Sequence, residues 1–233
     1  DGPGDIYVPR QYSTIQEAIY RSWNDGTVRV ADGTYTDRGN RDIDLLGRAI
    51  TVRSETGPEN CIIDCNGTQD EPHRGFYIHS TEDSNSVIDG FTITNGYAPN
   101  GYGGGIYCRD SSPTVTNCTF SENSAGWDGG GMNNEDSSPT ITNCTFIGNS
   151  AVGNDGGAIN NRSSNPTITN CTFSENSAYD RGGAVCNIYS SSPTLTDCIF
   201  TGNSAGWDGG GIFNYASSPT ITNCTFIGNS AVG

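Results

Sequence analysis

A group of charged side chains early in the sequence is the first candidate for chemistry. Asp64, Asp83 and Asp89 supply carboxylates, and Arg74 and His79 lie between them. Paired carboxylates act as acid and base in glycoside hydrolysis, and a base beside a cationic group is what a polysaccharide lyase needs. If the chain cleaves a polysaccharide, we expect Asp64, Asp89, Arg74 and His79 to do so. The simpler interpretation is that these side chains occupy solvated loops and bends.

The rest of the sequence offers little catalytic machinery. All 11 basic residues are arginine, so no lysine can serve as a base, and both histidines, His73 and His79, precede the regular repeats. The sequence leaves enzyme activity open and favours its absence.

A second candidate is a metal site in a repeated turn. Asp128, Asp155 and Asp208 each come just before a glycine pair, and Arg181 holds this position in the intervening repeat. Stacked carboxylates beside glycine are candidate Ca²⁺ ligands. The simpler interpretation is that Arg181 relieves repulsion between Asp155 and Asp208. Apart from this possible structural calcium, the sequence predicts no cofactor.

A third candidate is a surface of threonines. Five T-x-T pairs recur at a fixed spacing, and alternation along a strand would point them outward. The ten residues are Thr114, Thr116, Thr140, Thr142, Thr167, Thr169, Thr194, Thr196, Thr220 and Thr222. Such a lattice of hydroxyl and methyl groups resembles ice-binding solenoids. The alternative is that threonine simply suits exposed strands.

These residues sit in tandem repeats of about 26–27 residues. An eight-residue block of the type PTITNCTF begins at Pro113, Pro139, Pro166, Pro193 and Pro219. A GG(G/A) block followed by Ile, Met or Val keeps the same period, and so does a Phe–Asn pair three residues apart. Residues 123–153 and 203–233 differ at only four positions, which indicates a duplicated block of three repeats. Stacked repeats of this length are typical of solenoids.

Each repeat predicts one coil of three short strands and three bends. Val115 and its equivalents alternate with threonine and should point inward, while Asn117 and its equivalents suit a left-handed bend. The following Cys and Phe should also be buried, and the glycine block should form the third strand. Two asparagine columns should form amide ladders. They are Asn123, Asn149, Asn176, Asn203 and Asn229, and Asn134, Asn161, Asn187 and Asn214.

The nine cysteines are predicted to be mainly small buried hydrophobes. Like residues in adjacent coils lie about 4.8 Å apart, too far for most disulfides. Five belong to one column, namely Cys118, Cys144, Cys171, Cys198 and Cys224. Cys61 and Cys65 could close a local loop, and the pairing of Cys108 and Cys186 stays open. The N-C-T glycosylation sequons starting at Asn117 and its copies are interpreted as accidents of a packed bend.

Upstream, the pattern loosens but continues. Residues 87–96 align with 114–123, and strands are expected at Cys61–Asp64, Phe76–Ile78, Ala49–Val52 and Val28–Val30. Residues 14–23 give the one helical pattern, with Thr14 as N-cap and Trp23 on the buried face. We therefore divide the chain into an N-terminal cap with the first strands (1–60) and β-helix coils (61–233).

Together these segments carry a resemblance to known families. YSTIQEAI, VRVADGTYTD, AITVRSE and GFTITNG resemble the start of the pectate-lyase-like right-handed parallel β-helix superfamily. The GG(A/G)I and FxxN coils are similar to the repeats of chlamydial polymorphic outer-membrane proteins. The resemblance implies an all-β, right-handed single-stranded β-helix with an N-terminal capping helix. The superfamily includes polysaccharide lyases, glycoside hydrolases and adhesins, so it implies no single activity.

Composition limits the partners. The formal net charge of −15 disfavours nucleic acid and anionic lipid, and no segment is apolar enough for membrane insertion. The chain opens at Asp1 and stops at Gly233 before the next glycine block, so we expect a removed leader and an open last coil. That coil predicts either a longer array or head-to-tail association with another copy.

The resulting prediction is a secreted or cell-surface structural β-helix without catalytic activity, acting as a spacer, adhesin or filament subunit. The alternative is a module that binds or cleaves polysaccharide, with glycans as partners. An ice-binding surface is the third possibility.

Overall fold

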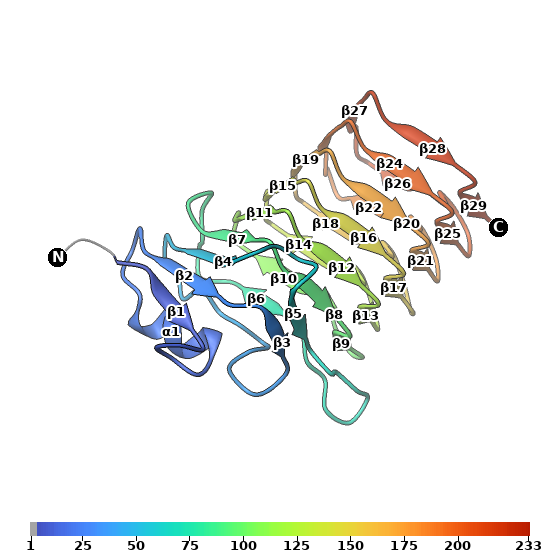
Figure 1. Ribbon diagram of the computed structural model, residues 1–233. Helices are drawn as coiled ribbons and strands as arrows, with labels where there is room; N and C mark the ends of the chain where they lie inside the picture. Colours follow the sequence, from blue (N-terminus) through green and yellow to red (C-terminus); the bar gives the residue numbers. More distant parts are fainter. Residues whose placement is uncertain (1–3) are drawn as a thin grey trace.

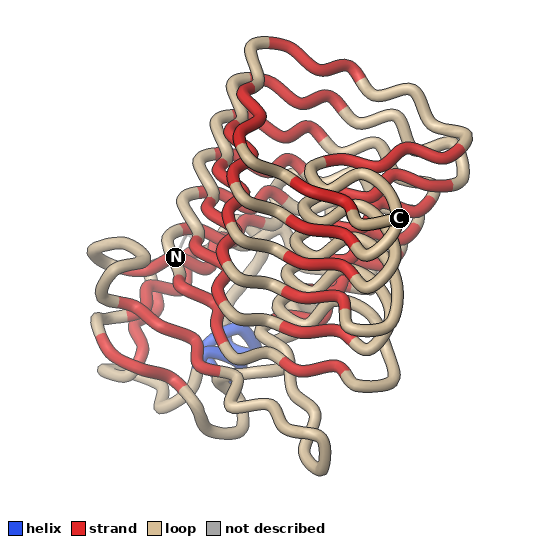
Figure 2. Tube along the Cα trace, turned by 90° about the vertical axis from the view of Figure 1, so that its right-hand side faces the viewer, coloured by secondary structure: helices blue, strands red, loops and turns tan. Residues whose placement is uncertain are grey.

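The computed structural model describes residues 4–233 as a parallel β-solenoid with one short helix near its N-terminal end (Figure 1). Every named strand pair is parallel, and the strands form four sheets that run along the solenoid (Figure 2). The first three residues, including Asp1 on which the expectation of a removed leader rests, lie outside the described part of the chain.

The sheets are lettered A to D. Sheet A contains β1 (Ile6–Val8), β2 (Thr27–Val30), β4 (Thr51–Ser54), β7 (Val87–Asp89), β11 (Thr114–Thr116), β15 (Thr140–Thr142), β19 (Thr167–Thr169), β23 (Thr194–Thr196) and β27 (Thr220–Thr222). Sheet B contains β3 (Gly33–Tyr35), β5 (Cys61–Asp64), β8 (Thr92–Thr94), β12 (Thr119–Ser121), β16 (Thr145–Ile147), β20 (Thr172–Ser174), β24 (Ile199–Thr201) and β28 (Thr225–Ile227). Sheet C contains β6 (Phe76–Ile78), β10 (Ile106–Arg109), β14 (Met132–Glu135), β18 (Ile159–Arg162), β22 (Val185–Ile188) and β26 (Ile212–Tyr215). Sheet D contains β9 (Tyr97–Ala98), β13 (Ser124–Ala125), β17 (Ser150–Ala151), β21 (Ser177–Ala178), β25 (Ser204–Ala205) and β29 (Ser230–Ala231).

A regular coil therefore passes through four strands, not the three predicted. The strand that the sequence did not reveal is the two-residue Ser-Ala segment of sheet D, such as β13. The glycine block was also misplaced, because the sheet C strand begins after it, at Ile106 in β10. Gly129 shows why glycine is needed there. It has φ +68°, and a Cβ atom would lie 2.4 Å from the carbonyl oxygen of Met132.

The core consists of the predicted columns of like residues. Val115, Ile141, Ile168 and Leu195 pair in register and are fully buried, and Ile221 continues the column in the last coil. The phenylalanine rings from Phe120 to Phe226 stack with centroid separations of 4.5–5.1 Å. Burying each such side chain contributes roughly 1.5–3 kcal/mol. The coil-to-coil repetition thus builds one continuous apolar core.

Both predicted amide ladders are present. Each Nδ2 in the first ladder donates to the Oδ1 of the next asparagine, from Asn123 through to Asn229. The second ladder runs the same way from Asn134 to Asn214. Most of these side chains are completely buried, so the ladders satisfy amide groups that water cannot reach.

The predicted helix is α1 (Ile15–Arg21), and it packs beside β1 and β2. The Thr14 side chain accepts a hydrogen bond from the backbone N–H of Glu17, as expected of an N-cap. Ile15, Ala18 and Ile19 are buried, which confirms the apolar face. Trp23 was wrongly assigned to that face, because the helix ends at Arg21 and the indole is 77% exposed.

Burial of the cysteines is largely as predicted. All nine are free; eight are buried and Cys224 is partly exposed. The suggested local loop between Cys61 and Cys65 is wrong. Cys61 begins the extended strand β5 and Cys65 directly follows it, so their Cα atoms are about 13 Å apart, far beyond disulfide reach. Asn117 has the predicted left-handed conformation, with φ 52°. The prediction that it lies in a packed bend was wrong, because Asn117 is exposed and packing does not shield its sequon from glycosylation.

Candidate functional site on the outer face of sheet C

Of the four sheets, sheet C has the outward residues that differ most from coil to coil, whereas those of sheet B in the regular coils are limited to threonine, serine and isoleucine. In sheet A the ten outward positions from β11 to β27 are all threonine, and sheet D presents serine from β13 to β29. The outward pairs in sheet C are Tyr107 and Arg109, Asn133 and Glu135, Asn160 and Arg162, Cys186 and Ile188, and Phe213 and Tyr215. The fold does not require this variety, because the same core lies beneath every coil.

The duplicated block supports the same conclusion. Of its four differences, one is inward in sheet C, where Met132 becomes Ile212. Two are outward in sheet C, where Asn133 and Glu135 correspond to Phe213 and Tyr215, and the fourth is the next residue, Asp136 against Ala216. The other three sheets are identical between the two copies. Between residues 123–153 and 203–233, divergence is therefore confined to sheet C and the bend that follows it.

The N-terminal half of this face carries five aromatic rings in contact, which we call the aromatic row. His79 stacks on Tyr77 with centroids 4.0 Å apart, and Tyr77 stacks on Tyr107 at 5.3 Å. Tyr102 links Tyr107, at 5.7 Å, to the edge of Trp127, at 5.0 Å. Because Tyr77 and Tyr107 are register partners in β6 and β10, the parallel sheet itself holds their rings together.

Polar groups border the aromatic row. The Arg74 guanidinium lies 5.5 Å from the ring centroids of both Tyr77 and Tyr107, and burial lowers its pKa. The Tyr107 hydroxyl donates to the Glu135 carboxylate, and burial together with this bond raises the pKa of Tyr107. Asp42 and Asp44 join Arg74 and the rings around a cavity of about 430 Å³. Apolar ring faces with a few fixed polar groups are the usual lining of a small-molecule site.

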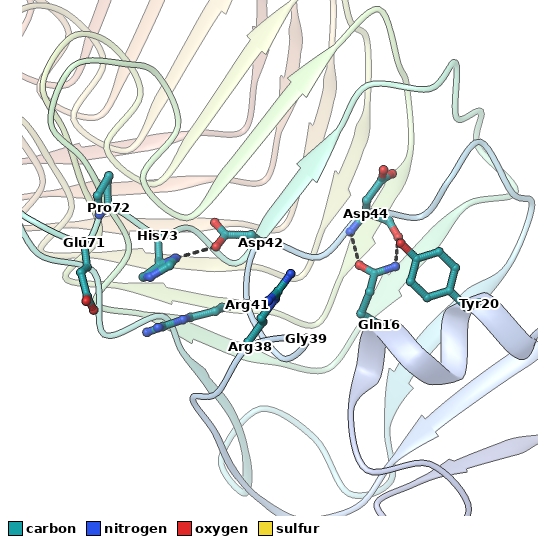
Figure 3. A pocket seen from close by; sticks show the side chains of 10 residues that line it. All are labelled: Gln16, Tyr20, Arg38, Gly39, Arg41, Asp42, Asp44, Glu71, Pro72 and His73. Atoms are coloured by element: carbon teal, nitrogen blue, oxygen red, sulfur yellow. Dashed lines mark hydrogen bonds and ion pairs between the residues drawn. The ribbon is translucent and has the colours of Figure 1, made fainter.

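A larger cavity of about 730 Å³ adjoins this one and shares Asp42 and Asp44 with it (Figure 3). Asp42 accepts a hydrogen bond from the backbone N–H of Arg74 and lies 2.6 Å from Nδ1 of His73, which fixes the imidazole ring. Gln16 reaches across from α1 and bonds both backbone groups of Asp44. The helix, the loop before β6 and sheet C thus form one continuous, mixed-charge surface.

The structure disperses the predicted catalytic group. Asp64 lies on sheet B, where it accepts from Asn95, and Asp89 lies on sheet A, where it pairs with Arg53 at 3.1 Å. Asp83 caps its own turn by accepting from Asn85. Only Arg74 and His79 come together, in the cavity beside the aromatic row. The two predicted carboxylates therefore do not face one sugar, and this arrangement of Asp64, Asp89, Arg74 and His79 is not a glycosidase or lyase centre.

The aspartate column exists, but its carboxylates already have partners. Asp128 Oδ1 accepts from the backbone N–H of Asp155, and Asp155 Oδ1 accepts from that of Arg181. Arg181 Nε also lies 3.8 Å from Asp208 Oδ2. Within residues 4–233 no group of three or more His, Cys, Asp or Glu side chains is placed to hold a metal ion. Calcium at Asp128, Asp155 and Asp208 thus stays a prediction without a geometric basis.

The threonine surface is aligned as predicted. Thr114, Thr140, Thr167, Thr194 and Thr220 are successive register partners, and so are Thr116 and its equivalents. This regularity is what the fold alone would produce on an exposed strand.

The fold is that of a β-helix, and comparison with known protein families gives the same fold. The chain matches the family model described as "Right handed beta helix region" over residues 6–173 and 103–233, and it therefore belongs to that family. The superfamily predicted from the sequence is confirmed, whereas the likeness to chlamydial repeats stays a prediction. No curated protein matches the chain.

Similar solved structures include pectin methylesterases. The carrot enzyme gives a TM-score of 0.57 at 11% identity, covering 98% of this chain and 84% of its own. The enzyme from Aspergillus niger gives 0.56 at 14%, covering 99% and 87%. At these identities the likeness establishes the fold alone. Among residues 4–233, no helix is long and apolar enough to cross a membrane.

Proposed function

We propose that this protein is an extracellular β-helix without catalytic activity that binds polysaccharide on the outer face of sheet C. The observation that carries the proposal is the aromatic row, in which five rings from three coils contact one another beside two cavities. The variation of sheet C between the otherwise identical segments 123–153 and 203–233 supports a binding role for this face.

The chemistry of the row suits sugars. A pyranose has an apolar face of C–H groups that packs on aromatic rings, and hydroxyls at its rim that need hydrogen-bond partners. Tyr77 and Tyr107 supply half-buried rings, while Arg74 and Asp42 supply a donor and an acceptor at their border. A pectin methylesterase of similar fold has been solved with a hexasaccharide, at 9% identity and a TM-score of 0.51. The fold is therefore compatible with a bound glycan.

A direct test is to measure binding of soluble polysaccharides by calorimetry or affinity electrophoresis. Tyr107→Asn introduces the residue that the next coil holds at Asn133, so it should fold while removing the central ring. We expect it to weaken binding at least tenfold, while Thr142→Ala on sheet A leaves binding unchanged. Equal binding by both variants and the unchanged protein would refute the proposal.

Head-to-tail assembly is a second candidate role. In this 233-residue chain the last coil leaves its inward residues Ile221 and Phe226 at 42% and 47% exposure, and β27 and β28 have one unpaired edge. A further coil or a second copy would cover this surface. Light scattering should show concentration-dependent association of the 233-residue polypeptide. It should remain a monomer after addition of a polar capping coil, and a monomer in both forms would exclude assembly through this edge.

A further inference from the structure

The C-terminal half of sheet C carries a second set of rings, which we call the distal cluster. It comprises Tyr189, Trp207, Phe213 and Tyr215. Phe213 and Tyr215 are outward residues of β26, Tyr189 follows β22, and Trp207 belongs to the turn before β26. Tyr189 and Trp207 are 52% and 60% exposed, so the regular coils leave them uncovered.

The distal cluster shares one feature with the aromatic row, an arginine guanidinium placed over an aromatic ring. The Arg181 guanidinium lies 5.2 Å from the Phe213 ring centroid, and that of Arg162 lies 4.9 Å from the Tyr189 centroid. Arg74 has the same relationship to Tyr77 in the aromatic row. In each place, fixed donors border an apolar ring face. Such an arrangement suits a sugar with an apolar face and a hydroxyl rim.

The two sets lie on one face at a defined separation. Four strand-to-strand steps connect Tyr107 in β10 to Phe213 in β26, which corresponds to about 19 Å. Between them, the successive outward positions hold the small side chains of Asn133, Asn160 and Cys186, all of which are almost completely buried. A ligand that touches both sets must therefore be an extended chain lying along the solenoid axis.

The charges along this path favour an uncharged chain. The outward pair Glu135 and Arg162 are register partners of opposite sign, and Arg181 lies beside Asp155 and Asp208. A polyanion would gain little from these balanced groups and would meet the overall charge of −15.

We infer that the distal cluster is a second subsite for a neutral, linear polysaccharide that runs parallel to the solenoid axis from the aromatic row. This rests on the proposed function and adds to it the ligand class, its direction and a second contact. Two linked contacts on one chain raise the affinity for a polymer above that for a short oligosaccharide, because the second contact is intramolecular.

The duplicated block provides a matched variant. Phe213→Asn with Tyr215→Glu restores the outward residues of β14, which the same core already supports in the first copy. The probes are a mixed-linkage glucan, a galactomannan and a xylan, each with its own trisaccharide, measured by calorimetry. Thr194→Ala on sheet A is the control, and thermal unfolding checks that each variant is folded.

We expect the double variant to lose at least tenfold in affinity for the polymer that the unchanged protein binds, with affinity for its trisaccharide unchanged. Polymer binding that is equal in the variant and the unchanged protein would overturn the distal subsite alone. Failure of the unchanged protein to bind any of the three polymers would overturn both this inference and the proposed function.

Discussion

Asn176 accepts two hydrogen bonds from Asn149 in the preceding coil, because its Oδ1 lies 3.0 Å from both the backbone N and the Nδ2 of Asn149. Both side chains are completely buried. The asparagine ladder is thus a chain of obligatory bonds between coils, and removal of one member leaves its neighbour unsatisfied.

Asn176→Ala should therefore lower the free energy of unfolding by roughly 2–4 kcal/mol, since two buried donors lose their acceptor. The control is Asn170→Asp in the exposed ladder of the same coil, which introduces the residue that the next coil holds at Asp197. We expect it to change stability by less than about 1 kcal/mol. Urea unfolding followed by circular dichroism measures both, and equal losses would contradict the role of the buried ladder.

The buried cysteines should not react with thiol reagents while the protein is folded. Burial raises the pKa of Cys61 to about 12 and that of Cys144 well above its ordinary range. A thiol-specific reagent should label at most Cys224 under native conditions and all nine cysteines in urea. Mass spectrometry of the labelled protein counts the reacted thiols. Rapid native labelling of several would mean that the coils open easily.

Asp128 should make stability depend on pH. Burial raises its pKa from the ordinary 3.8 to about 6; the hydrogen bond from the Asp155 backbone opposes this rise, and the Asp155 carboxylate charge adds to it. Between these values the folded protein holds a proton that the unfolded chain releases, so stability falls as pH rises through this window. The loss attributable to Asp128 is roughly 3 kcal/mol at most.

Asp128→Asn should remove most of that dependence, because an amide still accepts from the Asp155 backbone and does not ionise. Asp208→Asn is the matched control, since the Asp208 side chain is 63% exposed. Urea midpoints measured from pH 4 to pH 7 test the prediction. If the stability of the Asp128 variant still falls with rising pH, other groups cause the dependence. Asp155 is the first candidate, because its pKa is also raised.

No cleavage of pectate, alginate or similar polymers is expected, because Asp64 lies on sheet B, Asp89 on sheet A and Arg74 in the loop before β6. The measurement is the ultraviolet absorbance of unsaturated products, together with a reducing-sugar assay. Product formation that is lost in Asp64→Asn, Asp89→Asn or Arg74→Ala would show that a catalytic centre had been missed.

The sequence predicted the coils well because each core position repeats its chemistry at every turn. The strands Cys61–Asp64 and Phe76–Ile78 even have the predicted bounds. The strands of sheet D were not predicted, because two residues are too few to show the alternation of buried and exposed side chains that marks a strand. The site was only half predicted. Arg74 and His79 were singled out for catalysis, but with the sheet C strand assigned to the glycine block, nothing in the sequence indicated that Tyr107 would face outward.

Residues 123–153 and 203–233 differ only in sheet C and the bend that follows it, which indicates how such a chain can change after a duplication. The inward residues of all four sheets carry the stacking that folds each coil, so a new copy inherits the same core together with outward positions that can change. Phe213 and Tyr215 illustrate how the outward positions of sheet C can change while Phe226 and the inward asparagine ladder that ends at Asn214 are kept. The residues that vary and the residues that stack therefore occupy separate columns of the same repeat, and every added coil lengthens the variable outer face of sheet C.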